Sequence, residues 1–199
     1  MSEDKRDRIL DAALCLINRY GFDKTTVSEI AREAGIAKGT VYLYFQSKDE
    51  IYYALLARES NRNKERIIPK LQAAADPVEK LRLFLLEVGM TLLENEFARQ
   101  TLKRDYLPRF QGYANSDVGR QHGDEGVAFL VAMLEDGMAK GYFRNLDPTR
   151  VALVMYNNIS SLVLLSMLME DMYSTEEIKE LIRVNADLMV HGLVKEDAK

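Results

Sequence analysis

Residues 25–48, TTVSEIAREAGIAKGTVYLYFQSK, decide the fold of the N-terminal part of the chain, because they predict two short helices joined by a tight turn. Thr26 and Glu29 have the spacing of a capping box, in which a hydroxyl and a carboxylate satisfy two backbone N–H groups at the start of a helix. Gly35 ends that helix, since glycine adopts a left-handed backbone conformation at little cost. A second helix then begins within a few residues. This pattern predicts a hairpin of the helix-turn-helix type.

The second helix of this hairpin has two different faces. Val41 and Phe45 lie four residues apart and are expected to face the core. The remaining side chains, with the tyrosine that follows, offer a cation, hydroxyl groups, an open backbone position and aromatic rings: they are Lys38, Gly39, Thr40, Tyr42, Leu43 and Tyr44. Such groups suit the phosphates, base edges and thymine methyls of a DNA major groove. The alternative is an ordinary helical hairpin whose tyrosines cover a hydrophobic neighbour.

A nucleotide-binding loop is another interpretation of Gly35, Lys38 and Gly39. Such a loop has four residues between its glycines, and its lysine follows the second glycine. Here the lysine precedes Gly39. The sequence therefore does not support a nucleotide-binding site.

Residues 25–48 resemble the helix-turn-helix signature of the TetR family of bacterial transcription regulators. The helix at 6–20, the Gly21-Phe22 link and the start of the fourth helix resemble the family too. The resemblance implies an all-α fold with an N-terminal three-helix DNA-binding domain and a larger C-terminal helical domain for ligand binding and dimerisation, about nine helices in all. The implied boundaries are 1–48 for the DNA-binding domain, about 48–68 for the connecting fourth helix, and 69–199 for the larger domain.

Carried over position by position, the resemblance implies a set of DNA contacts. Thr40, Tyr42 and Leu43 are expected near base edges, whereas the residues expected at the phosphate backbone are Thr26, Lys38, Tyr44 and Lys48. The full set is Thr26, Ser28, Lys38, Gly39, Thr40, Tyr42, Leu43, Tyr44 and Lys48. Lys48 lies in the first turn of the fourth helix, where its ammonium and the free backbone N–H groups are both expected to hold a phosphate.

The net charge of −4 is unevenly distributed along the chain. Residues 1–68 carry 12 Lys and Arg against 11 Asp and Glu, whereas the remaining residues carry 15 against 20. DNA binding depends on where the cations point rather than on their sum. For Arg6 and Arg8, near the start of the first helix, we weigh phosphate contacts against ordinary solvated charges.

The chain has one cysteine, Cys15, so no disulfide can form within it. Its position beside Leu16 and Ile17 predicts a buried, small hydrophobic side chain in a reducing compartment. The alternative is a reactive thiol sensor. The charged N-terminus lacks the apolar segment of a signal peptide, and we therefore expect a cytoplasmic protein.

Helices are expected throughout the rest of the chain. Asp76 and Pro77 form a helix start signal, and Ser174 with Glu177 forms another capping box. The expected elements are a fourth helix that ends at Pro69, helices at 77–94, 95–105, 125–140 and 147–172, a loop or a partly formed helix at 108–126, and a last helix after 174.

The helix at 147–172 is apolar around most of its circumference, so a membrane span is the rival interpretation. We reject it because Asn157, Asn158 and several serines interrupt the run, and no cluster of Lys or Arg flanks it. A helix buried on both sides fits better if a second copy of the chain covers it. We expect a homodimer through a four-helix interface at 147–194, burying about 2,000 Å² or more. Its two recognition helices would lie about 34 Å apart and read a palindrome.

The resemblance implies a small-molecule pocket in the larger domain, whose filling moves the fourth helix and changes the spacing of the two DNA-binding domains. The candidates for its wall are Met90, Phe97, Tyr106, Phe110, Phe129, Met133, Met155 and Asn158, and the alternative for each is an ordinary core position. The 9 methionines and the few inward ionisable groups favour an apolar or aromatic effector.

Two other classes of function are weighed. A helical enzyme would use Asp105, Glu135 or His122 as an acid, but no nucleophile, base and orienting group occur at a meaningful spacing. A protein-binding adaptor would leave the tyrosine-rich face of the second hairpin helix unused. We therefore expect a ligand-responsive transcription regulator that binds a palindromic operator in double-stranded DNA as a dimer, with no catalytic residues, cofactor or metal. We expect repression, although the sequence does not determine whether DNA binding represses or activates transcription.

Overall fold

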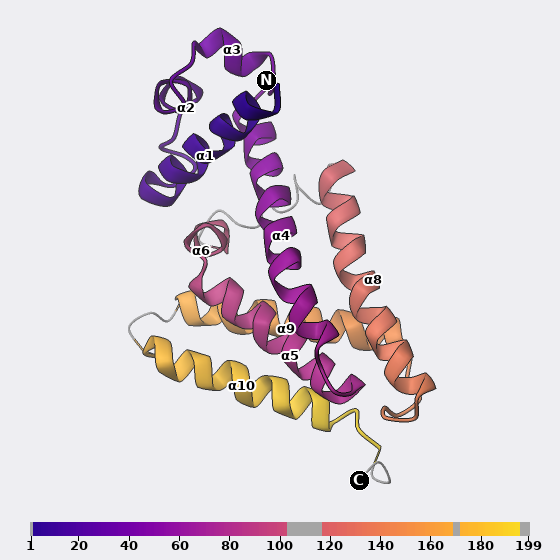
Figure 1. The fold of residues 1–199 in the computed structure, drawn as a ribbon. Coiled ribbons are helices and arrows are strands. Elements are labelled where there is room, and N and C mark those ends of the chain that lie inside the picture. Colours follow the sequence, from indigo (N-terminus) through magenta and orange to yellow (C-terminus); the bar gives the residue numbers. More distant parts are fainter. Residues whose placement is uncertain (1, 103–116, 169–171, 196–199) are drawn as a thin grey trace. The chain divides into compact units, whose positions relative to one another are not determined.

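The computed structural model describes residues 2–102, 117–168 and 172–195, and within these residues the chain is helical, with nine helices and no strand (Figure 1). The prediction of an all-α fold is confirmed. The helices are α1 (Ser2–Tyr20), α2 (Val27–Glu33), α3 (Lys38–Tyr42), α4 (Lys48–Gln72), α5 (Pro77–Glu94), α6 (Glu96–Leu102), α8 (Asp117–Ala139), α9 (Pro148–Leu168) and α10 (Thr175–His191).

The chain divides into two compact units. The head unit comprises Met1–Arg62 and Glu96–Arg120, and the second unit comprises Asn63–Asn95 and Gln121–Lys199. α4 therefore contributes its first part to the head unit and its last part to the second unit. The division differs from the expected boundaries at α6, which belongs to the head unit. Phe97 of α6 is 2% exposed in the head core, where its ring centroid lies 5.7 Å from that of Tyr52.

The core of the head unit is built on one side of α1 and on α2, α3 and α4. Its largest fully buried side chains are Ile9, Leu10, Ile17, Ile30, Ile51 and Leu55. Cys15 is exposed, so the expectation of a buried thiol is wrong. Cys15 lies two residues from both Ala13 and Ile17, which are buried, and two residues turn an α-helix by about 200°. The thiol therefore faces away from the core.

Both ends of α2 have the predicted geometry. At its start the Glu29 N–H donates to Thr26 Oγ1 over 3.2 Å, and the Thr26 N–H donates to a Glu29 carboxylate oxygen over 2.9 Å, which confirms the capping box. At its end Gly35 has φ +64°, and the Ile36 N–H donates to the Ala31 carbonyl over 3.0 Å. This is the bonding of a Schellman motif, so the chain turns sharply into α3.

Two helix boundaries differ from those expected. α4 continues through Pro69 instead of ending there. The proline removes one backbone hydrogen bond, but Ile67 and Leu71 are buried on either side of it and hold the last turn. α8 begins at Asp117, so of the two expectations for 108–126, a loop or a partly formed helix, the structure has the helix from that residue on. A glycine inside a helix costs only about 1 kcal/mol relative to alanine, and the buried C-terminal half of α8 offsets this.

In the second unit α5 packs against both α9 and α10. The core side chains are Leu81, Leu85, Leu130, Met133, Leu134, Phe143, Met155, Ile159, Ala186 and Val190. At Gly89 of α5 a Cβ would lie 2.7 Å from Ile182 Cγ2 of α10, so the missing side chain lets these helices approach closely. Gly137 of α8 lies against the buried ring of Phe143, which a Cβ would overlap. Among the described residues, no helix has both the length and the apolar composition that crossing a membrane requires.

Candidate nucleic-acid interface

α3 lies between the α2 turn and α4, and it turns one side to the head core. We call the residues on its other side, with the one that follows the helix, the α3 face: Lys38, Gly39, Thr40, Tyr42 and Leu43. Thr40 is half-buried and the others are exposed. Val41 and Phe45 are buried beneath them, whereas Tyr42 is 47% exposed and Leu43 is 83% exposed. The structure thus leaves open the surface on which the prediction of DNA reading depends.

The α3 face combines a cation, a phenol and an uncovered stretch of backbone. The Lys38 ammonium lies 6.0 Å from the centroid of the Tyr42 ring. Apart from its two chain neighbours and the backbone of its own helix, no heavy atom lies within 4 Å of the position that a Cβ on Gly39 would occupy. The packing of this chain therefore does not require a glycine at position 39. A partner that comes close to the helix backbone would require one.

The N-terminal end of α2 carries two more of the predicted contacts, Thr26 and Ser28, and both are exposed. The Thr26 hydroxyl is engaged in the capping box, since it donates to the Glu29 carboxylate over 2.7 Å. Hydrogen bonds from the Thr26 hydroxyl and backbone hold the pKa of the Glu29 carboxyl below its usual value. Ser28 is therefore the more accessible hydroxyl at this end of α2.

The last two predicted contacts, Tyr44 and Lys48, are less exposed than most of the α3 face. Tyr44 is half-buried and packs against the head core. The Lys48 ammonium points to the turn between α1 and α2, where it donates to the Phe22 carbonyl over 2.9 Å and to the Thr25 carbonyl over 3.0 Å. It also lies 4.2 Å from the centroid of the Phe22 ring. Lys48 thus has partners within the head unit.

The sequence reasoning missed the structural role of three residues in the head unit. Thr25 is 1% exposed, and its hydroxyl donates to the Gly21 carbonyl over 2.8 Å. An Arg8 N–H donates to the Ala34 carbonyl over 2.5 Å at the end of α2, and the Arg6 guanidinium lies 5.2 Å from the centroid of the Phe45 ring. A hydroxyl just before a helix cap was a local signal for Thr25, but nothing local predicts partners 26 or more residues away.

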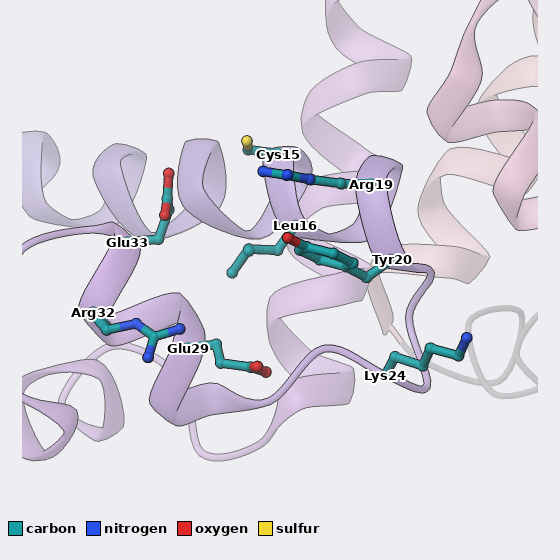
Figure 2. A pocket seen from close by; sticks show the side chains of 8 residues that line it. All are labelled: Cys15, Leu16, Arg19, Tyr20, Lys24, Glu29, Arg32 and Glu33. Atoms are coloured by element: carbon teal, nitrogen blue, oxygen red, sulfur yellow. The ribbon is translucent and has the colours of Figure 1, made fainter.

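A depression of about 240 Å³ lies on the head unit between α1 and α2 (Figure 2). Its lining combines side chains of both charges with the exposed thiol: Cys15, Leu16, Arg19, Tyr20, Lys24, Glu29, Arg32 and Glu33. Figure 2 shows Cys15, Leu16, Arg19 and Tyr20 on α1, and Glu29, Arg32 and Glu33 on α2. None of these lining residues is a predicted DNA contact, although Glu29 is bonded to one of those contacts, Thr26, in the capping box.

The predicted effector contacts are divided between several places. Met133 and Met155 are buried together in the core of the second unit. Phe129 is partly exposed, with its ring 5.7 Å from that of Phe84, and Met90 is half-buried. The structure does not bring the remaining candidates into this group: Phe97 is in the head core, Asn158 is exposed on α9, and Tyr106 and Phe110 lie outside the described residues.

Comparison with known sequences matches residues 9–55 to the family described as bacterial regulatory proteins, tetR family. The chain is 33% identical over 119 residues to the fatty acid metabolism regulator protein of Bacillus subtilis (strain 168), covering 54% of this chain and 61% of that protein. It is 30% identical over 105 residues to the transcriptional repressor KstR of Rhodococcus jostii (strain RHA1), covering 53% of this chain and 49% of that protein. The chain thus spans only 49–61% of the length of these relatives.

The fold has close likenesses among solved structures. The fatty acid degradation regulator FadR of Bacillus halodurans superposes with a TM-score of 0.75 at 24% identity, covering 94% of this chain and 95% of that one. FadR of Bacillus subtilis, solved in complex with stearoyl-CoA, also gives a TM-score of 0.75 at 24% identity, with 93% and 97% covered.

A helix-turn-helix head followed by a helical second unit defines a class of DNA-binding regulators. Residues 9–55 match the TetR family of bacterial regulatory proteins, and the regulators reported above are similar to the chain over about half of its length. The relatives reported above are named as regulators or repressors, in agreement with the prediction that the chain is not an enzyme.

Proposed function

We propose that this chain is a transcriptional repressor that binds an operator through the α3 face and releases it when a small, largely apolar effector binds the second unit. The observation that carries the proposal is the open α3 face above the buried Val41 and Phe45. In a major groove, Thr40, Tyr42 and Leu43 meet base edges, while Lys38 neutralises a phosphate. Thr26, Ser28, Gly39 and Tyr44 complete the contacts. The repressor acts in the cytoplasm, where its DNA lies.

The proposed repressor is a homodimer through α9 and α10. Each helix buries one side in the second unit and exposes apolar side chains on another. On α9, Leu153 is exposed and Val154 is 63% exposed; on α10, Val184 is exposed and Leu188 is 70% exposed. α10 buries a different stripe, made of Ile178, Ile182, Ala186 and Val190. A second copy that covers these outer sides forms a four-helix interface.

The dimer explains how a small head recognises a long DNA site. Two α3 faces about 34 Å apart enter successive major grooves on one side of the duplex and read a palindrome. A change in their separation then weakens binding without altering either face. α4 is one continuous helix with residues in both units, so it offers a covalent route for that change. A nearly complete switch requires the effector to prefer one state by about 10⁴-fold, or about 5.5 kcal/mol.

The effector we propose carries a long apolar chain. Within the second unit, the buried Met133 and Met155 are flexible apolar side chains that adapt to such a ligand. Two kinds of relative support the same class: one is named for fatty acid metabolism, and a solved regulator of similar fold holds stearoyl-CoA. Acyl-CoA thioesters are therefore the effectors to test first.

The experiment starts by selecting duplexes that the full chain binds from a random pool. Fluorescence anisotropy then compares a selected duplex with a scrambled version at several salt concentrations, while sedimentation velocity measures the mass of the free protein. Stearoyl-CoA is titrated into the complex, with free coenzyme A as the control. We expect at least about 10³-fold preference for the selected duplex, a dimer at micromolar concentration, and release by stearoyl-CoA alone.

Each part of the proposal has its own failing result. Equal affinity for selected and scrambled duplexes would reject the repressor. A monomer at micromolar concentration would reject the α9 and α10 interface. If stearoyl-CoA left the complex intact while the first two results held, the effector would belong to another chemical class.

A further inference from the structure

The turn between α1 and α2 has three carbonyl groups that all accept hydrogen bonds. The Gly21 carbonyl accepts from the Thr25 hydroxyl. The Phe22 carbonyl accepts from the Thr25 N–H over 3.2 Å and from the Lys48 ammonium, and the Thr25 carbonyl accepts from the same ammonium. A cation at the start of α4 thus closes a turn that ends at Thr26, the residue that caps α2.

The other end of α2 is held in the same way from a different helix. The Arg8 side chain of α1 donates to the Ala34 carbonyl, just where the chain turns toward α3. Its terminal nitrogen also lies 3.1 Å from the position of a Cβ on Gly35. The seven-residue α2 is therefore fixed at both ends by cations, Lys48 from α4 and Arg8 from α1.

From this geometry we infer that Lys48 is a positioning residue, which orients α2 and thereby α3 on DNA, rather than a phosphate contact. The inference rests on the proposed function. It replaces the family-derived expectation for this lysine, because the ammonium has three N–H groups and two of them donate to the turn.

A phosphate contact would draw on the same ammonium. Turning the Lys48 side chain toward DNA would break both bonds to the turn and remove the ammonium from the face of the Phe22 ring. The Thr25 carbonyl belongs to a residue that is 1% exposed, and a buried carbonyl without a donor is costly. Lys38 has no comparable engagement: it is exposed, and its contact with Tyr42 is a long one of 6.0 Å. Lys38 is therefore the matched control.

The first experiment uses the full-length protein without DNA. Lys48→Met keeps the apolar stem of the side chain but removes the donors, and Lys38→Met removes the same charge from the α3 face. Amide hydrogen exchange is measured for residues 22–30. We expect about tenfold faster exchange in Lys48→Met and no change in Lys38→Met, because only the first substitution frees the turn and the start of α2.

The second experiment measures DNA binding against salt concentration, with a selected duplex and its scrambled version. A lysine that neutralises a phosphate contributes about 0.9 to the slope of log affinity against log salt. We expect Lys38→Met to flatten this slope. Lys48→Met should keep the wild-type slope and lose about tenfold to a hundredfold in affinity for the selected duplex, with a smaller loss for the scrambled one.

Three results would overturn the inference. The first is a slope in Lys48→Met that flattens as in Lys38→Met, which identifies a phosphate contact. The second is an equal loss for both duplexes, which identifies a general loss of folded protein. The third is unchanged exchange at residues 22–30. The slope does not depend on the fraction of active protein, so it distinguishes a phosphate contact from a positioning residue even for a destabilised variant. If the wild-type chain selects no duplex, the proposed function fails. The exchange measurement still tests whether Lys48 holds the turn between α1 and α2.

Discussion

The α3 face and the outer sides of α9 and α10 both expose apolar side chains, but the polar groups beside them differ. On the α3 face, Tyr42 and Leu43 stand next to the Lys38 ammonium. On α9, the exposed Leu153 and Val154 belong to a run at 151–169 that contains no charged residue. The first combination suits a polyanion that displays methyl groups, and the second suits another apolar surface. Exposure alone therefore does not distinguish the α3 face from the outer side of α9, whereas the neighbouring charge does.

Leu188→Glu tests the apolar side of this comparison and should have the largest effect. By symmetry the substitution would place two carboxylates in the proposed interface, and an uncompensated buried charge costs about 3–5 kcal/mol. We expect a monomer at micromolar concentration in sedimentation velocity and a loss of operator binding. Leu43→Glu, on the α3 face, should stay a dimer and lose DNA binding through charge repulsion. If the Leu188→Glu variant were still a dimer, the outer side of α10 would not be the apolar interface that the comparison assumes.

Gly137→Ala tests how closely the interior of the second unit is packed, in contrast to its exposed outer sides. A Cβ at this position overlaps the ring of the fully buried Phe143. Overpacking of this kind lowers the free energy of unfolding by about 1–3 kcal/mol. The better helix propensity of alanine offsets up to about 1 kcal/mol of this loss. We expect a lower midpoint of thermal unfolding by circular dichroism. An unchanged midpoint would show that Phe143 moves aside without loss.

Gly39→Ala is the counterpart on the α3 face. Apart from its chain neighbours and the backbone of its own helix, nothing lies within 4 Å of the new Cβ, so the free protein should be as stable as the wild type or more stable by up to about 1 kcal/mol. Operator affinity should fall about tenfold, because a methyl group would hold the helix backbone away from the DNA. Thermal unfolding and anisotropy titration on the same sample check both statements. Unchanged affinity would mean that DNA does not approach this part of α3.

The two capping boxes, one in each unit, predict the smallest effect, which depends on pH. Hydrogen bonds from Thr26 and Ser174 hold the pKa of Glu29 and of Glu177 below the ordinary value of 4.5. A lowered pKa in the folded state means that the stabilisation is complete above pH 4.5 and is lost as the pH falls through the folded-state pKa. Glu29→Gln should therefore lower the thermal midpoint at neutral pH and close the gap to the wild type in acid. A gap that is constant with pH would contradict this.

Several features of the fold could be read from neighbouring residues. The capping boxes at Thr26 and Ser174, the left-handed Gly35 and the inward pair Val41 and Phe45 all depend on contacts within one or two helical turns. Their spacing in the sequence is therefore their spacing in the structure. The same local rule identified the α3 face.

Other features depended on partners far along the chain. On α10 the apolar residues divide between a buried side with Ile178 and Ile182 and an exposed side with Leu181 and Leu188. Apolar periodicity cannot distinguish the two, because both have helical spacing and only the neighbouring helices determine which is covered. The predicted effector contacts divided for a similar reason, since Phe97 of α6 joined the head core.

The sequence by itself determined that the chain is helical, where α2, α5 and α10 begin, and which side of α3 faces outward. The tertiary structure decided that the Lys48 ammonium turns to carbonyls 23 and 26 residues earlier in the chain, and that Arg8 reaches Ala34 at the end of α2. The reason is that helix caps and faces are set by interactions between near neighbours. The direction of a long, flexible cationic side chain is set by whichever acceptors the folded chain brings within its reach.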